Sequence, residues 1–204
     1  MARRCSSLAL IFAFCQLLTS CGGAARATQQ GPAEPNASVC SSFSDCSGQC
    51  ESGSAVGCQE LAILYETGEG VEQNYGKAAQ LYRQACERGA PRACSYLAVM
   101  HEIGLAVAED HKKASELYRR ACDGGLRDGC ASLGQKYAEG LGVRTDPGLA
   151  AKYYDQACRA GHAMSCSQLG LFYSRGKGVD KDPAIAHTLF QKACELGDSS
   201  ACGK

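Results

Sequence analysis

The sequence has no net charge, because its 21 lysines and arginines equal its 21 aspartates and glutamates. A chain without net positive charge has no general attraction to nucleic acids or anionic lipid surfaces, so the composition argues against both partners. No apolar run reaches the roughly 20 residues that a membrane-spanning helix needs. No alternating pattern typical of strands is present either, which leaves an all-α fold as the expected class.

A largely apolar run lies near the N-terminus, at residues 7–18, and follows Arg3 and Arg4. A basic start and an apolar stretch of this length are typical of a signal peptide. The next residues, Leu18 to Cys21, read LTSC and resemble a bacterial lipobox, whose cysteine is lipidated and becomes the first residue of the mature chain. The alternative is an ordinary signal peptide that is cleaved nearby.

The N-terminal pattern predicts a lipoprotein-type signal peptide over residues 1–20 and a lipidated Cys21. Residues 21–37 are rich in glycine, alanine, proline and polar residues, which is typical of a flexible tether. Gly22 follows the cysteine, and the absence of an acidic residue there favours the outer membrane in the usual bacterial sorting pattern. We therefore expect an exported protein in the periplasm or at the cell surface, attached to a membrane only through its lipid.

Cysteine is the residue that the chain has in excess, with 15 among 204. Ten cysteines form pairs that are eight positions apart and recur every 36 residues: Cys50–Cys58, Cys86–Cys94, Cys122–Cys130, Cys158–Cys166 and Cys194–Cys202. Such regular pairs predict a disulfide framework in an oxidising compartment. Zinc sites usually pair cysteines about two to four residues apart, so this spacing fits zinc badly. Cys40 and Cys46 would face different directions on a regular helix, so either the helix is broken there or both remain free.

The cysteine pairs belong to a repeat of 36 residues, which is the dominant feature of the chain. It defines four blocks: 55–90, 91–126, 127–162 and 163–198. Each block holds two helical patterns whose apolar faces it could not bury alone, so stacking predicts a right-handed α-solenoid stapled by one disulfide per repeat. Residues 38–54 are interpreted as an N-terminal half-repeat helix, and 199–204 as a tail that closes the last disulfide.

The ends of the predicted helices carry local signals. A glycine such as Gly68 after the first pattern of each block predicts a left-handed helix stop. The second pattern of each block starts at a residue suited to an N-cap: Asn74, Asp110, Asp146 and Asp182. Between blocks, a short return containing glycine can bring the paired cysteines to within the roughly 5.5 Å between Cα atoms that a disulfide needs.

Together these residues resemble the Sel-1-like repeat, a relative of the tetratricopeptide repeat. The resemblance covers residues 38–204 and rests on the turn Gly68-Glu69-Gly70-Val71, the following Lys-Ala-Ala or Leu-Ala-Ala, and the Tyr-x-x-Ala-Cys ending. One turn departs from the pattern, because Ala106 replaces the second glycine. The cysteine pairs make the chain similar to the bacterial cysteine-rich members of the Helicobacter type. This resemblance implies a scaffold for protein–protein contact, with penicillin binding and slow β-lactam hydrolysis, described for some members, as the alternative.

Candidate catalytic groups are sparse. Ser174 and Lys177 match S-x-x-K, but the serine is expected to end a helix instead of starting one, and no S-D-N or K-T-G string accompanies them. The histidines form no H-E-x-x-H motif, and His101 takes a position that is tyrosine in the other blocks, which favours a packed core histidine. We therefore predict no catalytic residue, no metal site and no cofactor.

Binding is the better supported hypothesis. In superhelical repeats the first helices tend to line the concave face, and the variable positions of these helices are the candidate contacts: Tyr96, Val99, Met100, Ile103, Gln135, Lys136, Glu139, Phe172 and Arg175. Apolar residues at one end and polar residues at the other would suit an extended peptide, unless many of them pack between helices. The predicted function is a scaffold that binds a protein or peptide at the bacterial cell envelope. A cell-wall fragment or a β-lactam is the alternative ligand.

Overall fold

The computed structural model describes residues 40–203. Within this range the chain forms nine α-helices, one short 3-10 helix and no strand, so the predicted all-α class is confirmed. The helices are α1 Phe43–Glu51, α2 Ala55–Thr67, α3 Tyr75–Glu87, α4 Pro91–Ile103, α5 His111–Asp123, α6 Arg127–Glu139, α7 Pro147–Arg159, α8 Ala163–Arg175, α9 Pro183–Glu195 and the 3-10 helix η1 Ser199–Ala201. The predictions for the signal peptide 1–20, Cys21 and the tether 21–37 lie outside the described residues.

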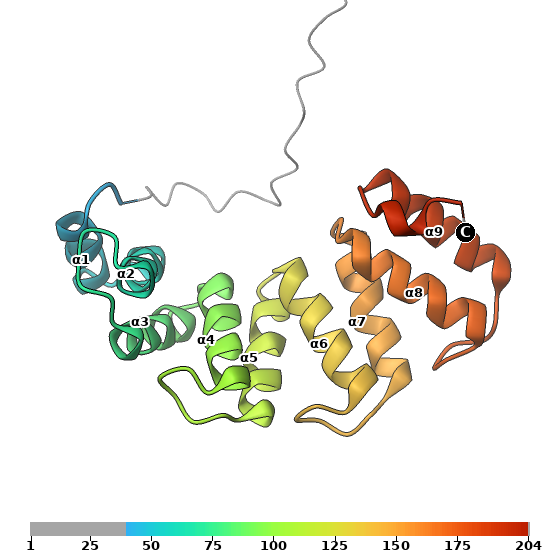
Figure 1. Ribbon diagram of the computed structural model, residues 1–204, viewed down its shortest axis with the longest axis horizontal. Helices are drawn as coiled ribbons and strands as arrows, with labels where there is room; N and C mark the ends of the chain where they lie inside the picture. The colour runs from blue at the N-terminus through green and yellow to red at the C-terminus, as the bar shows by residue number, and fades with distance from the viewer. Residues whose placement is uncertain (1–39, 204) are drawn as a thin grey trace, which may run out of the picture. The chain divides into compact units, whose positions relative to one another are not determined.

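Helices α2 to α9 form four pairs that follow one another in chain order (Figure 1). The closest packing is within the pairs: α2 with α3, α4 with α5, α6 with α7, and α8 with α9. The second helix of each pair then packs on the first helix of the next pair, and α1 packs on α2. Each repeat therefore packs on the repeats next to it in the chain, which is the defining property of a solenoid, so the predicted fold class is confirmed.

The sequence signals at the helix ends act as predicted. The first helices end at glycines in the left-handed conformation, with φ of 77°, 67°, 78° and 70°: Gly68, Gly104, Gly140 and Gly176. The second helices start at N-cap residues whose side chains accept a backbone N–H of the first turn: Asn74, Asp110, Asp146 and Asp182. These caps satisfy backbone groups that the helix itself leaves unpaired. They therefore set both ends of the connecting turn in every repeat.

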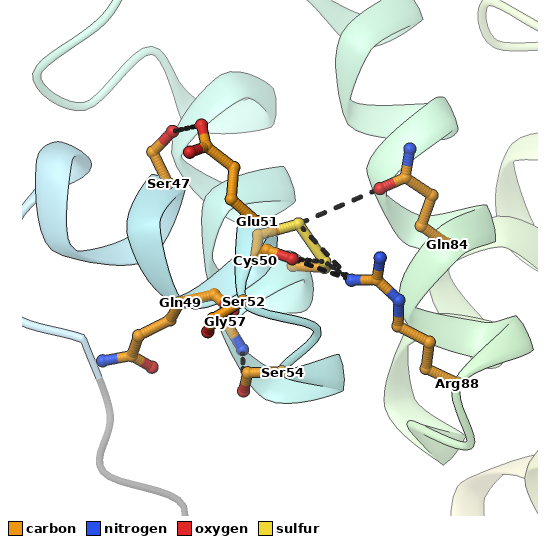
Figure 2. The surroundings of a disulfide bond; sticks show 10 residues. Ser47, Gln49, Cys50, Glu51, Ser52, Ser54, Gly57, Gln84 and Arg88 are labelled. Atoms are coloured by element: carbon orange, nitrogen blue, oxygen red, sulfur yellow. Dashed lines mark hydrogen bonds between the residues drawn. A yellow bond between two sulfur atoms is a disulfide. The ribbon is translucent and has the colours of Figure 1, made fainter.

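Disulfides join the successive pairs. The end of each second helix is bonded to the following segment, with Cα–Cα distances between 4.4 and 5.0 Å: Cys50–Cys58, Cys86–Cys94, Cys122–Cys130, Cys158–Cys166 and Cys194–Cys202. Figure 2 shows the first of these, with the guanidinium of Arg88 beside the sulfur atoms and donating to the Cys50 carbonyl at 2.9 Å. The side chain of Gln84, from α3, also approaches this disulfide. The second helix of a repeat thus contacts the disulfide at the junction before it.

The N-terminal half-repeat is shorter than predicted. Helix α1 begins at Phe43, because Ser42 is its N-cap and accepts the backbone N–H of Asp45. Cys40 therefore precedes the helix and bonds to Cys46, with 5.0 Å between the Cα atoms. The sequence left open whether the helix is broken or the two thiols are free. Because the helix starts only after Cys40, the two cysteines can meet and form a disulfide. The helix also covers less than the expected range of 38–54.

The glycine-rich turns of the third and fourth repeats, at Gly142 and Gly178, dock on the start of the second helix in the repeat before. The backbone at Gly142 has φ of +74°, and a Cβ atom there would lie 2.0 Å from the carbonyl oxygen of His111 at the start of α5. The Ser115 hydroxyl of α5 donates to the carbonyl of Leu141 in the same turn at 3.0 Å. In the second repeat, Ala106 stands at the position of Gly142 and also has a left-handed backbone, with φ of +57°. The close approach therefore requires glycine at position 142.

Candidate functional site

Helix α4 carries a cluster of exposed apolar side chains. Tyr96, Val99 and Ile103 are 40%, 42% and 65% exposed, and their spacing of three and four residues puts them on one side of the helix. The other large exposed apolar residues among those described lie apart, on α8, on α9 and in the α6–α7 turn. A contiguous exposed apolar surface is typical of an interaction site. We call these three residues the α4 face.

Three of the predicted contact residues are buried, which corrects the sequence interpretation. Met100 and Phe172 lie in the hydrophobic core, and Lys136 is also buried. The ring of Phe172 packs edge-on against Tyr154 with 5.6 Å between centroids. Lys136 and Phe172 contact the repeat before their own, and all three residues are buried, so they are not available to a partner.

The remaining predicted contacts are exposed and polar. Gln135 and Glu139 lie on α6 and are joined by a hydrogen bond of 2.9 Å from the Gln135 amide, while Arg175 ends α8. Among the predicted contact residues that are exposed, those on α4 are therefore apolar and those on α6 and α8 are polar, which is the change that the sequence predicted.

Lys136 takes part in a buried ion pair that links three helices. Its ammonium group contacts the Glu102 carboxylate of α4, and the Tyr118 hydroxyl of α5 donates to the same carboxylate at 2.6 Å. Burial, followed by the hydrogen bond to Glu102, raises the pKa of Tyr118 well above its usual value. One repeat earlier, the Tyr82 hydroxyl donates to Glu66 in the same way. The buried charges are paired and bonded within the core, so this group has a structural role.

The S-x-x-K residues do not meet as a catalytic pair. Ser174 lies in the last turn of α8, and its hydroxyl donates to the Leu171 carbonyl at 2.9 Å. Lys177 lies in the following turn, with its ammonium 5.1 Å from the centroid of the Phe172 ring. The serine proton and the lysine amine are therefore engaged with different groups. This arrangement offers no activated nucleophile of the penicillin-binding kind.

Sequence reasoning missed a serine, a histidine and an aspartate that come together at the start of α8. His162 Nδ1 lies 2.8 Å from the Ser165 hydroxyl, and His162 Nε2 lies 3.9 Å from the Asp128 carboxylate. Ser165 is 1% exposed, so no substrate can reach its hydroxyl. His162 also accepts the backbone N–H of Ser165, which makes the imidazole the N-cap of α8. Burial is the main cause that lowers the pKa of His162. The group therefore caps a helix.

His101 differs from its sequence interpretation. It is half-buried, and its Nδ1 lies 3.0 Å from the carbonyl oxygen of Ala108 in the following turn.

Among residues 40–203 no group of histidine, cysteine and acidic side chains is arranged to hold a metal ion. No helix in that part of the chain is long and apolar enough to cross a bilayer.

Four helix pairs with a disulfide at every junction define the class of this protein: a disulfide-stapled α-solenoid of short repeats. The Sel1 repeat family matches residues 55–89, 91–126, 127–162 and 163–198. The chain therefore belongs to the Sel1 repeat family, as its sequence motifs predicted. No match was found among curated proteins.

Solved structures of Sel1 repeat proteins resemble the fold. A Sel1 repeat protein from Oxalobacter formigenes is 26% identical with a TM-score of 0.69, and the match covers 78% of this chain and 63% of that one. The protective antigen c5321 of uropathogenic Escherichia coli is 29% identical with a TM-score of 0.66, over 79% of this chain and 42% of that one. The chain thus spans less than two thirds of either protein. Helicobacter pylori cysteine-rich protein B is 33% identical with a TM-score of 0.52, over 67% of this chain and 98% of that one.

Proposed function

We propose that this chain is an exported, lipid-anchored scaffold that binds a protein or peptide at the bacterial cell envelope. Sel1 repeats are typically protein-binding modules, and the chain belongs to that family. The observation that carries the proposal is the α4 face, where Tyr96, Val99 and Ile103 are exposed together. Burying such a cluster against a partner removes apolar area from water, which is the main driving force of association.

The exposed residues also suggest the chemistry of the partner. Its apolar part would pack on the α4 face, and its polar part would extend along α6 and α8 towards Gln135, Glu139 and Arg175. An extended segment with one apolar and one polar end matches this order. The buried Met100, Lys136 and Phe172 would support the surface from below without touching the partner.

Site-specific photocrosslinking tests the proposed surface in the native envelope. A photoreactive amino acid would be placed at Val99 or Ile103, and at the exposed Lys112 of α5 as the control. The proposal expects the same crosslinked partner from Val99 and Ile103 and none from Lys112. Equal crosslinking from all three positions would contradict it.

A substitution on the α4 face provides a quantitative second test. Val99→Asp places a charge at the centre of the face and should lower partner affinity about tenfold or more, as central interface residues do. Because Val99 is exposed, the melting temperature should change little. Unchanged affinity would refute this surface as the binding site.

Export and lipidation are tested separately. The disulfides of residues 40–203 indicate folding in an oxidising compartment, which supports export. A labelled fatty acid should be incorporated into the wild-type chain and not into Cys21→Ala, and the wild-type chain should fractionate with the membrane. A wild-type chain without label would disprove the anchor while leaving the binding proposal intact.

A further inference from the structure

A pocket of about 350 Å³ lies between α3 and α5 over one side of α4. Its floor contains Leu97 and His101, which lie on the side of α4 away from Val99 and the α4 face. The volume is within the range typical of small-molecule sites. The pocket is therefore separate from the proposed partner surface.

The corresponding position in the next repeat is filled by aromatic side chains. There the rings of Tyr137 and Tyr153 stack with 5.6 Å between centroids and 9° between planes. Arg119 covers them and donates to the Tyr137 hydroxyl at 2.7 Å. This junction shows how the repeat closes the space when both tyrosines are present.

The pocket is open because both tyrosines are absent from the second repeat. The residues 36 positions before Tyr137 and Tyr153 are His101 and Leu117, and both line the pocket. Arg83 occupies the position of the covering arginine but has no phenol beneath it. Between residues 40 and 203, no hydrogen bond or ion pair engages its guanidinium.

Cationic groups dominate the pocket wall. Arg83, Lys113 and Arg120 face two carboxylates, Glu87 and Asp110. The Asp110 carboxylate is already engaged, because it accepts the backbone N–H of Lys113 at 2.9 Å as the N-cap of α5. That hydrogen bond is the largest cause that lowers the pKa of Asp110. The three cations of the wall thus outnumber its two carboxylates, one of which already accepts a backbone N–H.

Two of the cations are held in place without losing their capacity to bind. Arg120 donates through one nitrogen to the Cys86 carbonyl at 2.7 Å, which orients its guanidinium and leaves its other N–H groups. Lys113 lies 3.5 Å from Glu116 in a half-exposed pair, and such pairs contribute little stability, so a ligand can replace this partner.

We propose that this pocket binds a small organic carboxylate. Its carboxylate would lie between Arg83, Lys113 and Arg120, and its aliphatic part would pack on Leu97 and Leu117. Guanidinium groups bind carboxylates through paired N–H donors, and the buried leucines provide the apolar contact.

The first repeat offers a natural comparison. The equivalent pocket, of about 260 Å³, lies against α2 and α3 and is lined by Leu61, Tyr65, Lys77 and Gln84. Here tyrosine and glutamine replace His101 and Arg120. Its one cation, Lys77, has its ammonium 4.9 Å from the centroid of the Tyr65 ring. Carboxylate binding is therefore expected in the second repeat and not in the first.

The test is a titration of the full, oxidised, isotope-labelled protein with glutarate, followed by nuclear magnetic resonance. Glutaramide, which is neutral and nearly the same shape, is the control ligand. Glutarate should cause saturable shifts at Lys113, Leu117 and the Arg83 side chain, weakened by added salt. Shifts of equal size with glutaramide, or no saturable shift with glutarate, would overturn the proposal.

Variants locate the site. Arg83→Gln and Lys113→Gln should each lower glutarate affinity about tenfold, since each removes a charge-assisted contact. The matched control Lys77→Gln should leave the affinity unchanged. His101→Tyr/Leu117→Tyr installs the tyrosine pair of the next repeat and should abolish binding while circular dichroism stays native. Binding that survives in this filled variant, or is lost equally in Lys77→Gln, would refute the assignment.

Discussion

Replacing Gly142 with alanine measures how strongly a turn locks one repeat onto the repeat before it. Alanine in the left-handed region costs about 1–2 kcal/mol for the backbone alone. The new Cβ would also lie 2.0 Å from the His111 carbonyl oxygen, whereas real Cβ contacts are essentially never under 3.0 Å, so the turn must retreat by about 1 Å. That movement stretches the hydrogen bond from Ser115 to Leu141, which contributes about 1 kcal/mol.

A matched glycine separates the two costs. Gly70 occupies the same position in the first repeat with φ of +71°, but no atom lies within 4 Å of the place that an added Cβ would take. Gly70→Ala should therefore lose only the backbone cost of about 1–2 kcal/mol. Gly142→Ala adds the steric cost, typically about 1–3 kcal/mol, and the hydrogen-bond loss of about 1 kcal/mol, so it should lose about 3–6 kcal/mol in all.

Urea unfolding of the oxidised variants, followed by circular dichroism, provides the assay. The difference between the two variants in unfolding free energy isolates the docking of the third repeat on the second. A difference of about 2 kcal/mol or more supports the reasoning. Equal losses from Gly142→Ala and Gly70→Ala would refute it, because the contact with His111 would then contribute nothing.

Three further predictions concern the staples, the buried charges and the helix cap. Cys122→Ala/Cys130→Ala should lower the unfolding free energy by about 2.6 kcal/mol, the chain-entropy value for so short a loop, and an unchanged urea midpoint would contradict this. Lys136→Met should cost about 2–3 kcal/mol, because Glu102 loses its cation but keeps some exposure. Glu102→Ala/Lys136→Phe, which installs the residues found one repeat later, should recover most of that loss, and a double variant as unstable as the single one would argue against the pair as the cause. Since burial lowers the pKa of His162 below 6.5, the stability linked to its neutral form is complete above that pH and is lost as the pH falls towards the folded pKa. His162→Asn keeps a capping side chain without the titration, so its melting temperature should fall less than that of the wild type between pH 7 and pH 5, and identical falls would exclude this histidine.

The repeat and the helix ends could be predicted because they depend on local chemistry. Capping by Asn74 or a stop at Gly68 involves residues within one turn, and the paired cysteines are only eight positions apart. Exposure at the binding surface depends instead on where the next helix pair lies. Met100 is only about 40° around the helix from Tyr96, and that small angle separates a core position from an exposed one. The sequence pattern does not resolve it.

Two other features depended on details that a regular pattern hides. The bond between Cys40 and Cys46 follows from the helix starting after Ser42, and an apolar stripe extrapolated backwards missed that start. The carboxylate pocket depends on what is missing at His101 and Leu117. It is recognised only by comparison with the next junction, where Tyr137 and Tyr153 stack and fill the equivalent space.

The constant position of the disulfides has a consequence for how this gene can change length. Deleting residues 91–126 would remove Cys94 and Cys122 together and bring Cys130 to eight positions after Cys86, the spacing of every native junction. Duplicating the same segment would add one complete pair. Recombination in steps of 36 residues therefore leaves no orphaned thiol, so the protein can gain or lose a repeat without creating a site for misoxidation or intermolecular crosslinking.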